Sequence, residues 1–196
     1  MIEIALSKGR IADSFIDILY RKKLIMEKPN IARELIFQYP NMKIMIARSS
    51  DLSKILDNKN ANLAVLGSDV IEEKLEEKYI ELMDLGIGKC TFALAALPNI
   101  NLEKIKSIAT KYPNLAKKYL KELKLQCEIK KMDGCLELFP NIGFSDGIID
   151  LVETGSTLKA NGLVILKTFE SISTRVITTK ENENNEEIKK LIYKIK

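Results

Sequence analysis

The sequence predicts an α/β fold made of two domains. Short apolar runs such as Ile2 to Leu6 alternate with stretches in which apolar residues recur at helical spacing, as they do from Ile11 to Leu19. Repeated strand–helix units of this kind imply largely parallel sheets covered by helices. The element Gly86-Ile87-Gly88 separates two series of such units, and we expect the chain to cross between the domains there.

The first domain is expected to comprise residues 1–88 together with residues 170–196. Its strands are predicted at 2–6, 35–39, 43–47 and 63–66, and its helices after Gly9, at 51–56 and from 67 to 77. Asp69 followed by Glu72 resembles a capping box for the last of these helices. A final helix that packs back on this domain is predicted by four apolar residues at helical spacing: Ile188, Leu191, Ile192 and Ile195.

The second domain is expected to comprise residues 89–169. Its strands are predicted at 91–97, 107–110, 125–130, 147–152 and 163–169, with a helix at 113–123. Pro113 suits the first turn of that helix, because an amide at that position would have no acceptor within the helix.

Composition and charge exclude several classes of protein. Lys and Arg number 31 against 27 for Asp and Glu, and the two signs are interspersed, so nucleic acid is not expected as a partner. No apolar run approaches the roughly 20 residues that span a bilayer, and no signal peptide precedes the first strand. We expect no membrane association and a cytoplasmic location. The three widely spaced cysteines argue against a disulfide framework.

Histidine is absent from the sequence, which excludes catalytic triads and histidine-ligated metals. Catalysis by this chain would therefore depend on carboxylates, Lys and Arg, hydroxyls, backbone amides, or a metal that arrives with a substrate. Enzymes that handle phosphates use such groups.

The most informative segment runs from Gly143 to Gly162. A strand that carries Asp150 and Glu153 leads into Thr154-Gly155-Ser156-Thr157, and a helical turn follows. A glycine- and hydroxyl-rich turn at a helix N-terminus offers free amides to a phosphate, and carboxylates suit ribose hydroxyls or a magnesium ion. A capped helix after a strand favours the same residue types, so the pattern alone leaves both interpretations open.

This segment resembles the phosphoribosyl-pyrophosphate loop of the ATP phosphoribosyltransferase family, in which a strand leads to an acidic residue and then Thr-Gly-x-Thr-Leu. The matching residues are Asp150, Glu153, Thr154, Gly155, Thr157 and Leu158, whereas Ser156 stands where the family often has arginine. Three further segments resemble the family in the same order: Leu6 to Arg10, Ala109 to Asn114 and Asp133 to Leu138. The region from Arg48 to Asp69 fits more loosely, because Ser49 replaces a proline and Asn62 an aspartate.

The resemblance implies two α/β domains with a cleft between them, similar to type II periplasmic binding proteins. It also implies transfer of the phosphoribosyl group of phosphoribosyl pyrophosphate to N1 of ATP, with release of pyrophosphate, as the first step of histidine biosynthesis. Adenine N1 has no proton to lose, so a general base is hardly needed. The chain resembles the short form, which implies a homodimer that assembles with a regulatory subunit similar to histidyl-tRNA synthetase.

The resemblance also assigns candidate site residues. Three cations are expected to act in catalysis by facing polyphosphate oxygens: Lys8, Arg33 and Arg48. The expected phosphoribosyl-pyrophosphate site consists of Asp150, Glu153, Thr154, Gly155, Ser156 and Thr157. Further candidates for substrate contacts are Gly9, Arg10, Gly67, Asp69, Glu137 and Asp146. Magnesium is expected to arrive with the pyrophosphate, and no protein ligand is assigned to it.

Two other functions fit parts of the pattern. A two-lobed module that binds anions or solutes without catalysis can have the same architecture. A phosphoribosyltransferase for another base would also need a phosphate loop, but such enzymes usually show two adjacent acidic residues before it. Here Leu151 and Val152 separate Asp150 from Glu153.

Overall fold

The computed structural model describes residues 1–74 and 79–196 and divides into two compact units. The first unit contains residues 1–88 and 173–196, and the second contains residues 89–172. The chain returns to the first unit at Ser173 instead of residue 170, because β10 (Val164–Ile172) pairs with β6 as far as Ile172. No helix in the described parts of the chain is long and apolar enough to cross a membrane.

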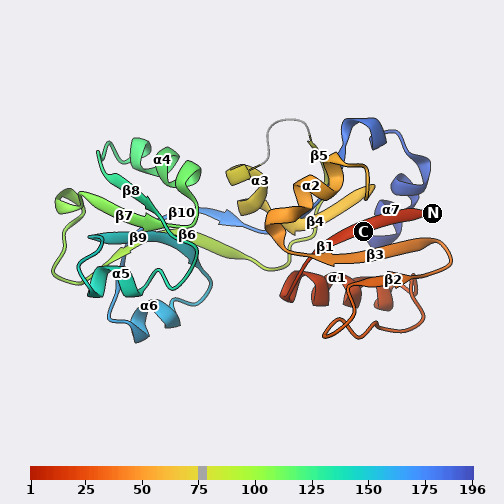
Figure 1. The fold of residues 1–196 in the computed structure, drawn as a ribbon, viewed down its shortest axis with the longest axis horizontal. Coiled ribbons are helices and arrows are strands. Elements are labelled where there is room, and N and C mark those ends of the chain that lie inside the picture. The colour runs from red at the N-terminus through yellow and green to blue at the C-terminus, as the bar shows by residue number, and fades with distance from the viewer. Residues whose placement is uncertain (75–78) are drawn as a thin grey trace. The chain divides into compact units, whose positions relative to one another are not determined.

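The first unit is built on a six-stranded sheet with the order β2-β3-β1-β4-β11-β5 (Figure 1). Its strands are β1 Ile2–Ser7, β2 Ile36–Gln38, β3 Met42–Ala47, β4 Leu63–Gly67, β5 Tyr79–Asp84 and β11 Thr174–Thr179. The central strands β3, β1 and β4 run parallel, whereas β2 and β11 run antiparallel to their neighbours. The sequence did not predict β11, although it fills the sheet between β4 and β5.

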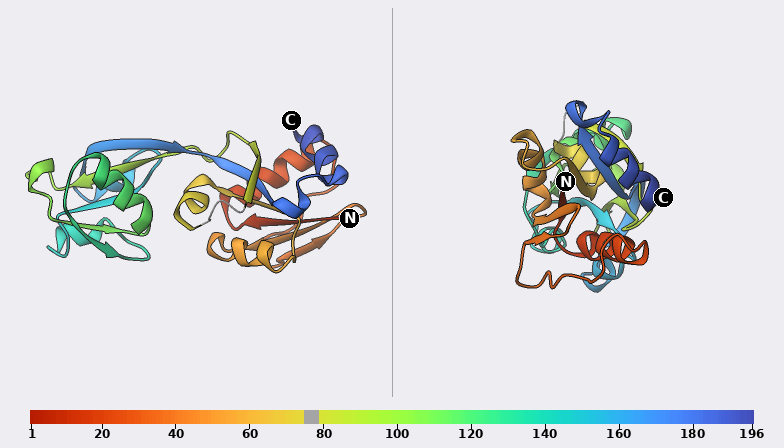
Figure 2. Two further views of the ribbon diagram at one scale, coloured as in Figure 1. Left: turned by 90° about the horizontal axis from the view of Figure 1, so that it is seen from above. Right: turned by 90° about the vertical axis from the view of Figure 1, so that its right-hand side faces the viewer.

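Helices cover both faces of this sheet. They are α1 Arg10–Arg21, α2 Leu52–Asp57, α3 Ser68–Lys74 and α7 Glu186–Ile195. Helices α1 and α7 share one apolar core, which includes Phe15, Leu19, Ile188 and Leu191, while α2 packs into a separate core on the opposite face (Figures 1 and 2). The prediction that the last helix packs back on the first unit is therefore confirmed.

Helix α3 differs from its predicted form. It begins at Ser68, so Asp69 lies within the first turn and not at the N-cap position where the prediction put it. The predicted continuation of the helix to Glu77 falls on residues 75–78, which lie outside the described residues.

The second unit is built on a five-stranded sheet with the order β10-β6-β9-β7-β8. Its strands are β6 Cys90–Ala96, β7 Ser107–Thr110, β8 Glu128–Lys131, β9 Gly147–Val152 and β10, and its helices are α4 Pro113–Glu122, α5 Leu138–Asn141 and α6 Ser156–Ala160. Helix α4 covers one face, where Phe92 and Tyr119 are buried, and α5 and α6 cover the other, where Leu158 is buried (Figure 1). Strands β9, β7 and β8 run parallel, and β6 is antiparallel to β9 and β10.

Strand β8 begins later than predicted, at Glu128 instead of residue 125. The reason lies at the end of α4, where Lys124 has a left-handed backbone with φ 57° and Leu125 N donates to Leu120 O at 2.9 Å. This hydrogen bond closes the helix, so the apolar Leu125 belongs to the helix cap and not to the strand.

Candidate functional site

In the first unit, two of the predicted cationic residues directly follow the ends of two neighbouring strands, at the same edge of the sheet. Ser7 pairs with Ala47 at the carboxyl ends of β1 and β3, and Lys8 N donates to Ala47 O at 2.8 Å. Lys8 and Arg48 are the next residues after these two strands, so they lie side by side. The chain turns to α1 on one face after β1 and to α2 on the other face after β3, which is the arrangement at which open α/β sheets bind ligands.

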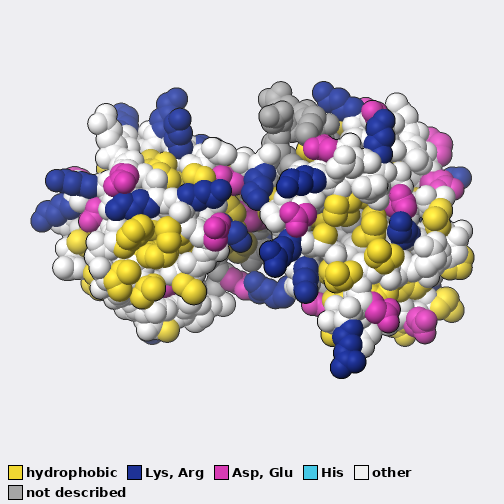
Figure 3. Space-filling view, viewed as in Figure 1, with side chains coloured by type: hydrophobic (Ala, Val, Ile, Leu, Met, Phe, Trp, Pro, Cys, Tyr) yellow, Lys and Arg dark blue, Asp and Glu magenta, His cyan; other side chains and the backbone are white. Residues whose placement is uncertain are grey.

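Arg33 lies at this edge as well. Strand β2 is antiparallel to β3, and Ile46 N donates to Leu35 O at 2.8 Å, so the start of β2 lies beside the end of β3. Arg33 precedes Leu35 by two residues in an exposed turn. Lys8, Arg33 and Arg48 are all exposed, and none forms an ion pair with an acidic side chain in the described parts of the chain. Figure 3 shows Lys and Arg side chains gathered where β1 and β3 end.

The other candidates of the first unit surround these cations. Gly9, with φ 97°, precedes α1, and Arg10 is its exposed first residue. Because Leu6 pairs with Val65, the end of β4 at Gly67 lies beside Lys8. A Cβ at Gly67 would lie 2.1 Å from Oδ1 of Asp69, a residue only 8% exposed, so the close approach of this carboxylate requires a glycine.

Sequence reasoning missed a serine pair at this edge. The Ser7 and Ser49 hydroxyls form a hydrogen bond between the ends of β1 and β3. A proline at position 49 would have no hydroxyl with which to form this link. A serine at the end of each of two parallel strands was the available signal.

In the second unit, β7 and β9 form a corresponding pair of parallel strands. Thr110 pairs with Ile149, and its buried hydroxyl donates to Ile149 O at 2.7 Å while accepting from Tyr112 N at 3.0 Å. The chain turns to α4 on one face after β7 and to α6 on the other face after β9. The predicted phosphate loop thus also lies where connections diverge at the carboxyl edge of a sheet. Sequence reasoning did not single out Thr110.

The loop itself is exposed and has the geometry of an anion-binding turn. Gly155 has a left-handed backbone with φ 75° and precedes α6, whose first residue is Ser156. The Thr154 and Ser156 hydroxyls lie 2.9 Å apart, and Lys159 N donates to Gly155 O at 3.0 Å. The preceding amides, of Thr157 and Leu158, therefore have no acceptor within the helix. The side chains of Thr154, Ser156 and Thr157 are exposed, so a ligand can reach them.

Three carboxylates accompany the loop at this edge. Asp150 is half-buried, and its Oδ1 accepts a hydrogen bond from Leu151 N at 2.8 Å, while Glu153 is exposed at the end of β9. Glu137 lies in the connection that follows β8, and its carbonyl accepts from Asn141 Nδ2, which also donates to Asn161 O beside α6. The described residues contain no group of three metal-ligating side chains. Magnesium bound mainly by substrate phosphates needs only one or two carboxylates, and this donor set fits that mode.

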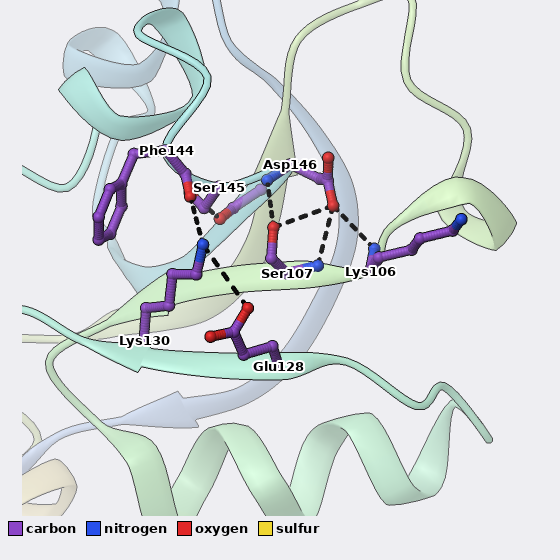
Figure 4. Close-up of polar contacts among 8 residues, drawn as sticks. Lys106, Ser107, Glu128, Lys130, Phe144, Ser145 and Asp146 are labelled. Atoms are coloured by element: carbon purple, nitrogen blue, oxygen red, sulfur yellow. Dashed lines mark hydrogen bonds and ion pairs between the residues drawn. The ribbon is translucent and has the colours of Figure 1, made fainter.

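Asp146, which the sequence suggests as a substrate contact, forms hydrogen bonds within the protein to the start of β7. Its Oδ2 accepts hydrogen bonds from Lys106 N, Ser107 N and Ser107 Oγ at 2.9–3.0 Å (Figure 4). It precedes β9, whereas the loop follows β9, and a strand of six residues separates the two by roughly 20 Å. Burial raises the pKa of Asp146, but the hydrogen bonds from Lys106 and Ser107 outweigh it and lower the pKa below its ordinary value. The hydrogen bonds of Asp146 therefore stabilise the start of β7.

Comparison with known proteins identifies the family. The HisG family model, described as ATP phosphoribosyltransferase, matches residues 48–196. The ATP phosphoribosyltransferase of Clostridium novyi is 39% identical over 204 residues, covering 99% of this chain and 96% of the relative. The chain belongs to the ATP phosphoribosyltransferase family. It is a pentosyltransferase of the short form that acts at the first step of histidine biosynthesis.

Further ATP phosphoribosyltransferases and solved structures support the family and the fold. The relative from Lactococcus lactis is 37% identical, with coverage of 92% of this chain and 89% of the relative. The structure of the ATP phosphoribosyl transferase (HisG:HisZ) complex from Thermotoga maritima matches the whole chain with a TM-score of 0.84 and 27% identity, covering 96% of that chain. The Candida albicans CA3427 gene product, whose structure is described as having the generic periplasmic binding protein fold, matches with a TM-score of 0.65 at 12% identity, covering 100% of this chain and 69% of that chain, which confirms the periplasmic-binding-protein-like fold.

Proposed function

We propose that the turn from Thr154 to Thr157 binds the 5′-phosphate of phosphoribosyl pyrophosphate. The observation that carries this proposal is the exposed turn at the carboxyl end of β9, in which Gly155 adopts φ 75° directly before α6. Free amides and the positive end of a helix favour a phosphate, and the hydroxyls of Thr154 and Ser156 add donors without bulk. Asp150 and Glu153 then accept hydrogen bonds from the ribose hydroxyls.

Lys8, Arg33 and Arg48 are the catalytic cations in this proposal. Adenine N1 displaces pyrophosphate at the anomeric carbon, so one C–N bond forms as one C–O bond breaks, and no proton has to be removed. The barrier falls through alignment of the two substrates, worth roughly 7–11 kcal/mol, and through stabilisation of the departing phosphates. Cations that have no ion pair to a described acidic side chain are available for polyphosphate oxygens. A reaction that requires no general base also suits a chain without histidine.

The remaining candidates have supporting roles. In this proposal Gly9 and Gly67 allow close approach of the backbone and Arg10 adds positive charge. Asp69 would accept a hydrogen bond from a nucleotide hydroxyl or amine. Glu137, in the connection that follows β8, would be a further acceptor for the donor substrate. Magnesium would neutralise the pyrophosphate while it leaves, held by substrate oxygens together with Asp150 or Glu153.

Release of pyrophosphate tests the proposal. The purified chain is mixed with magnesium and phosphoribosyl pyrophosphate, and ATP is compared with free nucleobases as acceptor. Pyrophosphate release that requires ATP is expected. Release with a nucleobase instead would indicate a different acceptor, and binding of phosphoribosyl pyrophosphate without turnover would indicate a module that only binds.

We also propose that the chain forms a homodimer that assembles with a regulatory subunit similar to histidyl-tRNA synthetase, in the cytoplasm. The support comes from the Thermotoga maritima structure, which is a HisG:HisZ complex. Light scattering of the chain alone and with such a subunit measures the assembly. Histidine should inhibit pyrophosphate release only in the mixture, and inhibition of the isolated chain would contradict this assignment.

A further inference from the structure

Lys111, the residue that follows β7, takes no part in the site described above. It lies between Thr110, which is 0% exposed, and Tyr112, which is 9% exposed, yet Lys111 itself is exposed. The Tyr112 ring packs edge-on against Phe92 on the α4 face, with ring centroids 5.0 Å apart. Successive side chains of an extended segment point to opposite faces, so Lys111 points to the face that carries α5 and α6.

The register of the strands places Lys111 beside Asp150. Ala109 pairs with Ile148 and Thr110 with Ile149, so the next position on each strand brings these two residues together. Neighbouring strands lie about 4.8 Å apart, and Asp150 shares its face with Ile148, which packs on the α6 side. The flexible four-carbon stem of Lys111 is long enough to extend from this position toward the phosphate loop.

The phosphate loop has no basic side chain near the first residues of α6, where the phosphate is proposed to bind. Between Gly143 and Gly162 the acidic residues are Asp146, Asp150 and Glu153, and the single basic residue is Lys159. Lys159 lies in the last turn of the short helix α6, away from the free amides. A donor substrate with several negative charges therefore meets a net acidic segment unless another element supplies positive charge.

We propose that Lys111 supplies this charge by donating a charge-assisted hydrogen bond to a phosphate oxygen of phosphoribosyl pyrophosphate. Its ammonium forms no ion pair with an acidic side chain among the residues that the structure describes. The inference rests on the proposed donor site and adds a residue that determines affinity for the donor. With this role for Lys111 the two units are alike. In each unit a lysine directly follows one of the two parallel strands whose connections turn to opposite faces of the sheet: Lys8 follows β1 and Lys111 follows β7.

The test compares four proteins: the wild type, Lys111→Gln, Lys111→Arg and the matched control Lys117→Gln. Lys117 is an exposed lysine on α4, on the opposite face of the sheet. Pyrophosphate release gives the KM for each substrate. Loss of a hydrogen bond to a charged group should raise the KM for phosphoribosyl pyrophosphate roughly tenfold or more in Lys111→Gln, with the KM for ATP within about twofold. Lys111→Arg should retain most of the affinity, and Lys117→Gln should match the wild type.

Titration with ribose 5-phosphate and with inorganic pyrophosphate identifies the phosphate that Lys111 contacts. Weaker binding of either ligand to Lys111→Gln supports the proposal and names the contact. Unchanged binding of both, or an equal loss in Lys117→Gln, overturns it. These titrations do not depend on turnover, so wild-type protein that binds ribose 5-phosphate but releases no pyrophosphate would refute the proposed reaction separately.

Discussion

The Thr110 hydroxyl donates a 2.7 Å hydrogen bond to the carbonyl of Ile149, which joins β7 to β9 three residues before β9 ends at Val152. The same hydroxyl accepts a hydrogen bond from Tyr112 N. One buried oxygen atom therefore links β7 both to β9 and to the start of α4. The connections that carry Lys111 and the phosphate loop both begin beyond this hydrogen bond. We therefore expect Thr110 to be a positioning residue for the proposed donor site.

Replacement Thr110→Val keeps the side-chain shape but leaves the Ile149 carbonyl and the Tyr112 amide without this partner. We expect the free energy of unfolding to fall by about 1–3 kcal/mol in denaturant titrations. The KM for phosphoribosyl pyrophosphate should rise while the KM for ATP changes little. The exposed strand residue Thr168 provides the control, because Thr168→Val should stay within about 0.5 kcal/mol of the wild type. Equal stability of the two variants would contradict the role of Thr110.

Periodicity located most of the elements that carry the site, because their apolar residues are buried in the pattern that the sequence shows. Strands β7 and β9 have the predicted bounds, and α4 begins at Pro113 as expected. Strand β11 escaped prediction for a physical reason. Only Ser173 separates it from β10, so no glycine or proline turn marks the place where the chain passes from one sheet to the other.

The prediction for Asp146 rests on its proximity to the phosphate loop along the chain. It is close to the phosphate loop in sequence, but the extended strand between them carries the two to opposite edges of the sheet. The opposite holds for Arg33, Arg48 and Lys8, which are distant in sequence and meet at one edge through strand pairing. Such pairing depends on tertiary contacts, and a single sequence does not reveal it.

Replacement Gly155→Ala places a side chain at a position with φ 75°. A left-handed backbone costs a residue with a Cβ roughly 1–2 kcal/mol, although the added atom would have ordinary space at 3.8 Å from Val152. Gly162→Ala is a matched control, since Gly162 has φ 72° and follows the other end of α6. We expect similar losses of stability in both variants, measured by thermal unfolding. Only Gly155→Ala should raise the KM for phosphoribosyl pyrophosphate, and equal kinetics in the two would contradict the phosphate site.

Replacement Asp146→Asn should change the pH dependence of stability. The hydrogen bonds from Lys106 and Ser107 lower the pKa of Asp146 below its value in the unfolded chain, near 3.8. The stabilisation is therefore complete above that unfolded pKa and is lost as the pH falls through the lower folded pKa. We expect the variant to be less stable at pH 7 by about 1–3 kcal/mol, with the difference shrinking below about pH 4. Urea titrations at several pH values measure this.

The exposed Asp133 is the control for Asp146, because Asp133→Asn removes one carboxylate without these hydrogen bonds. Its stability curve should follow that of the wild type. Since Asp146 lies at the opposite end of β9 from the phosphate loop, the KM values of Asp146→Asn should also be unchanged. A raised KM for phosphoribosyl pyrophosphate with intact stability would restore Asp146 to the site.

Replacement Arg48→Gln removes the positive charge that lies beside Lys8 at the ends of β3 and β1. If Arg48 stabilises the departing pyrophosphate, its loss should cost about 3 kcal/mol of transition-state stabilisation, which lowers kcat roughly a hundredfold or more. Arg48→Lys should recover part of the rate, because charge is retained while the two-pronged hydrogen bonding of the guanidinium is lost. Lys54→Gln, at an exposed position on α2, should leave kcat unchanged. A rise confined to the KM for ATP, with kcat intact, would show that Arg48 binds the acceptor without assisting the displacement.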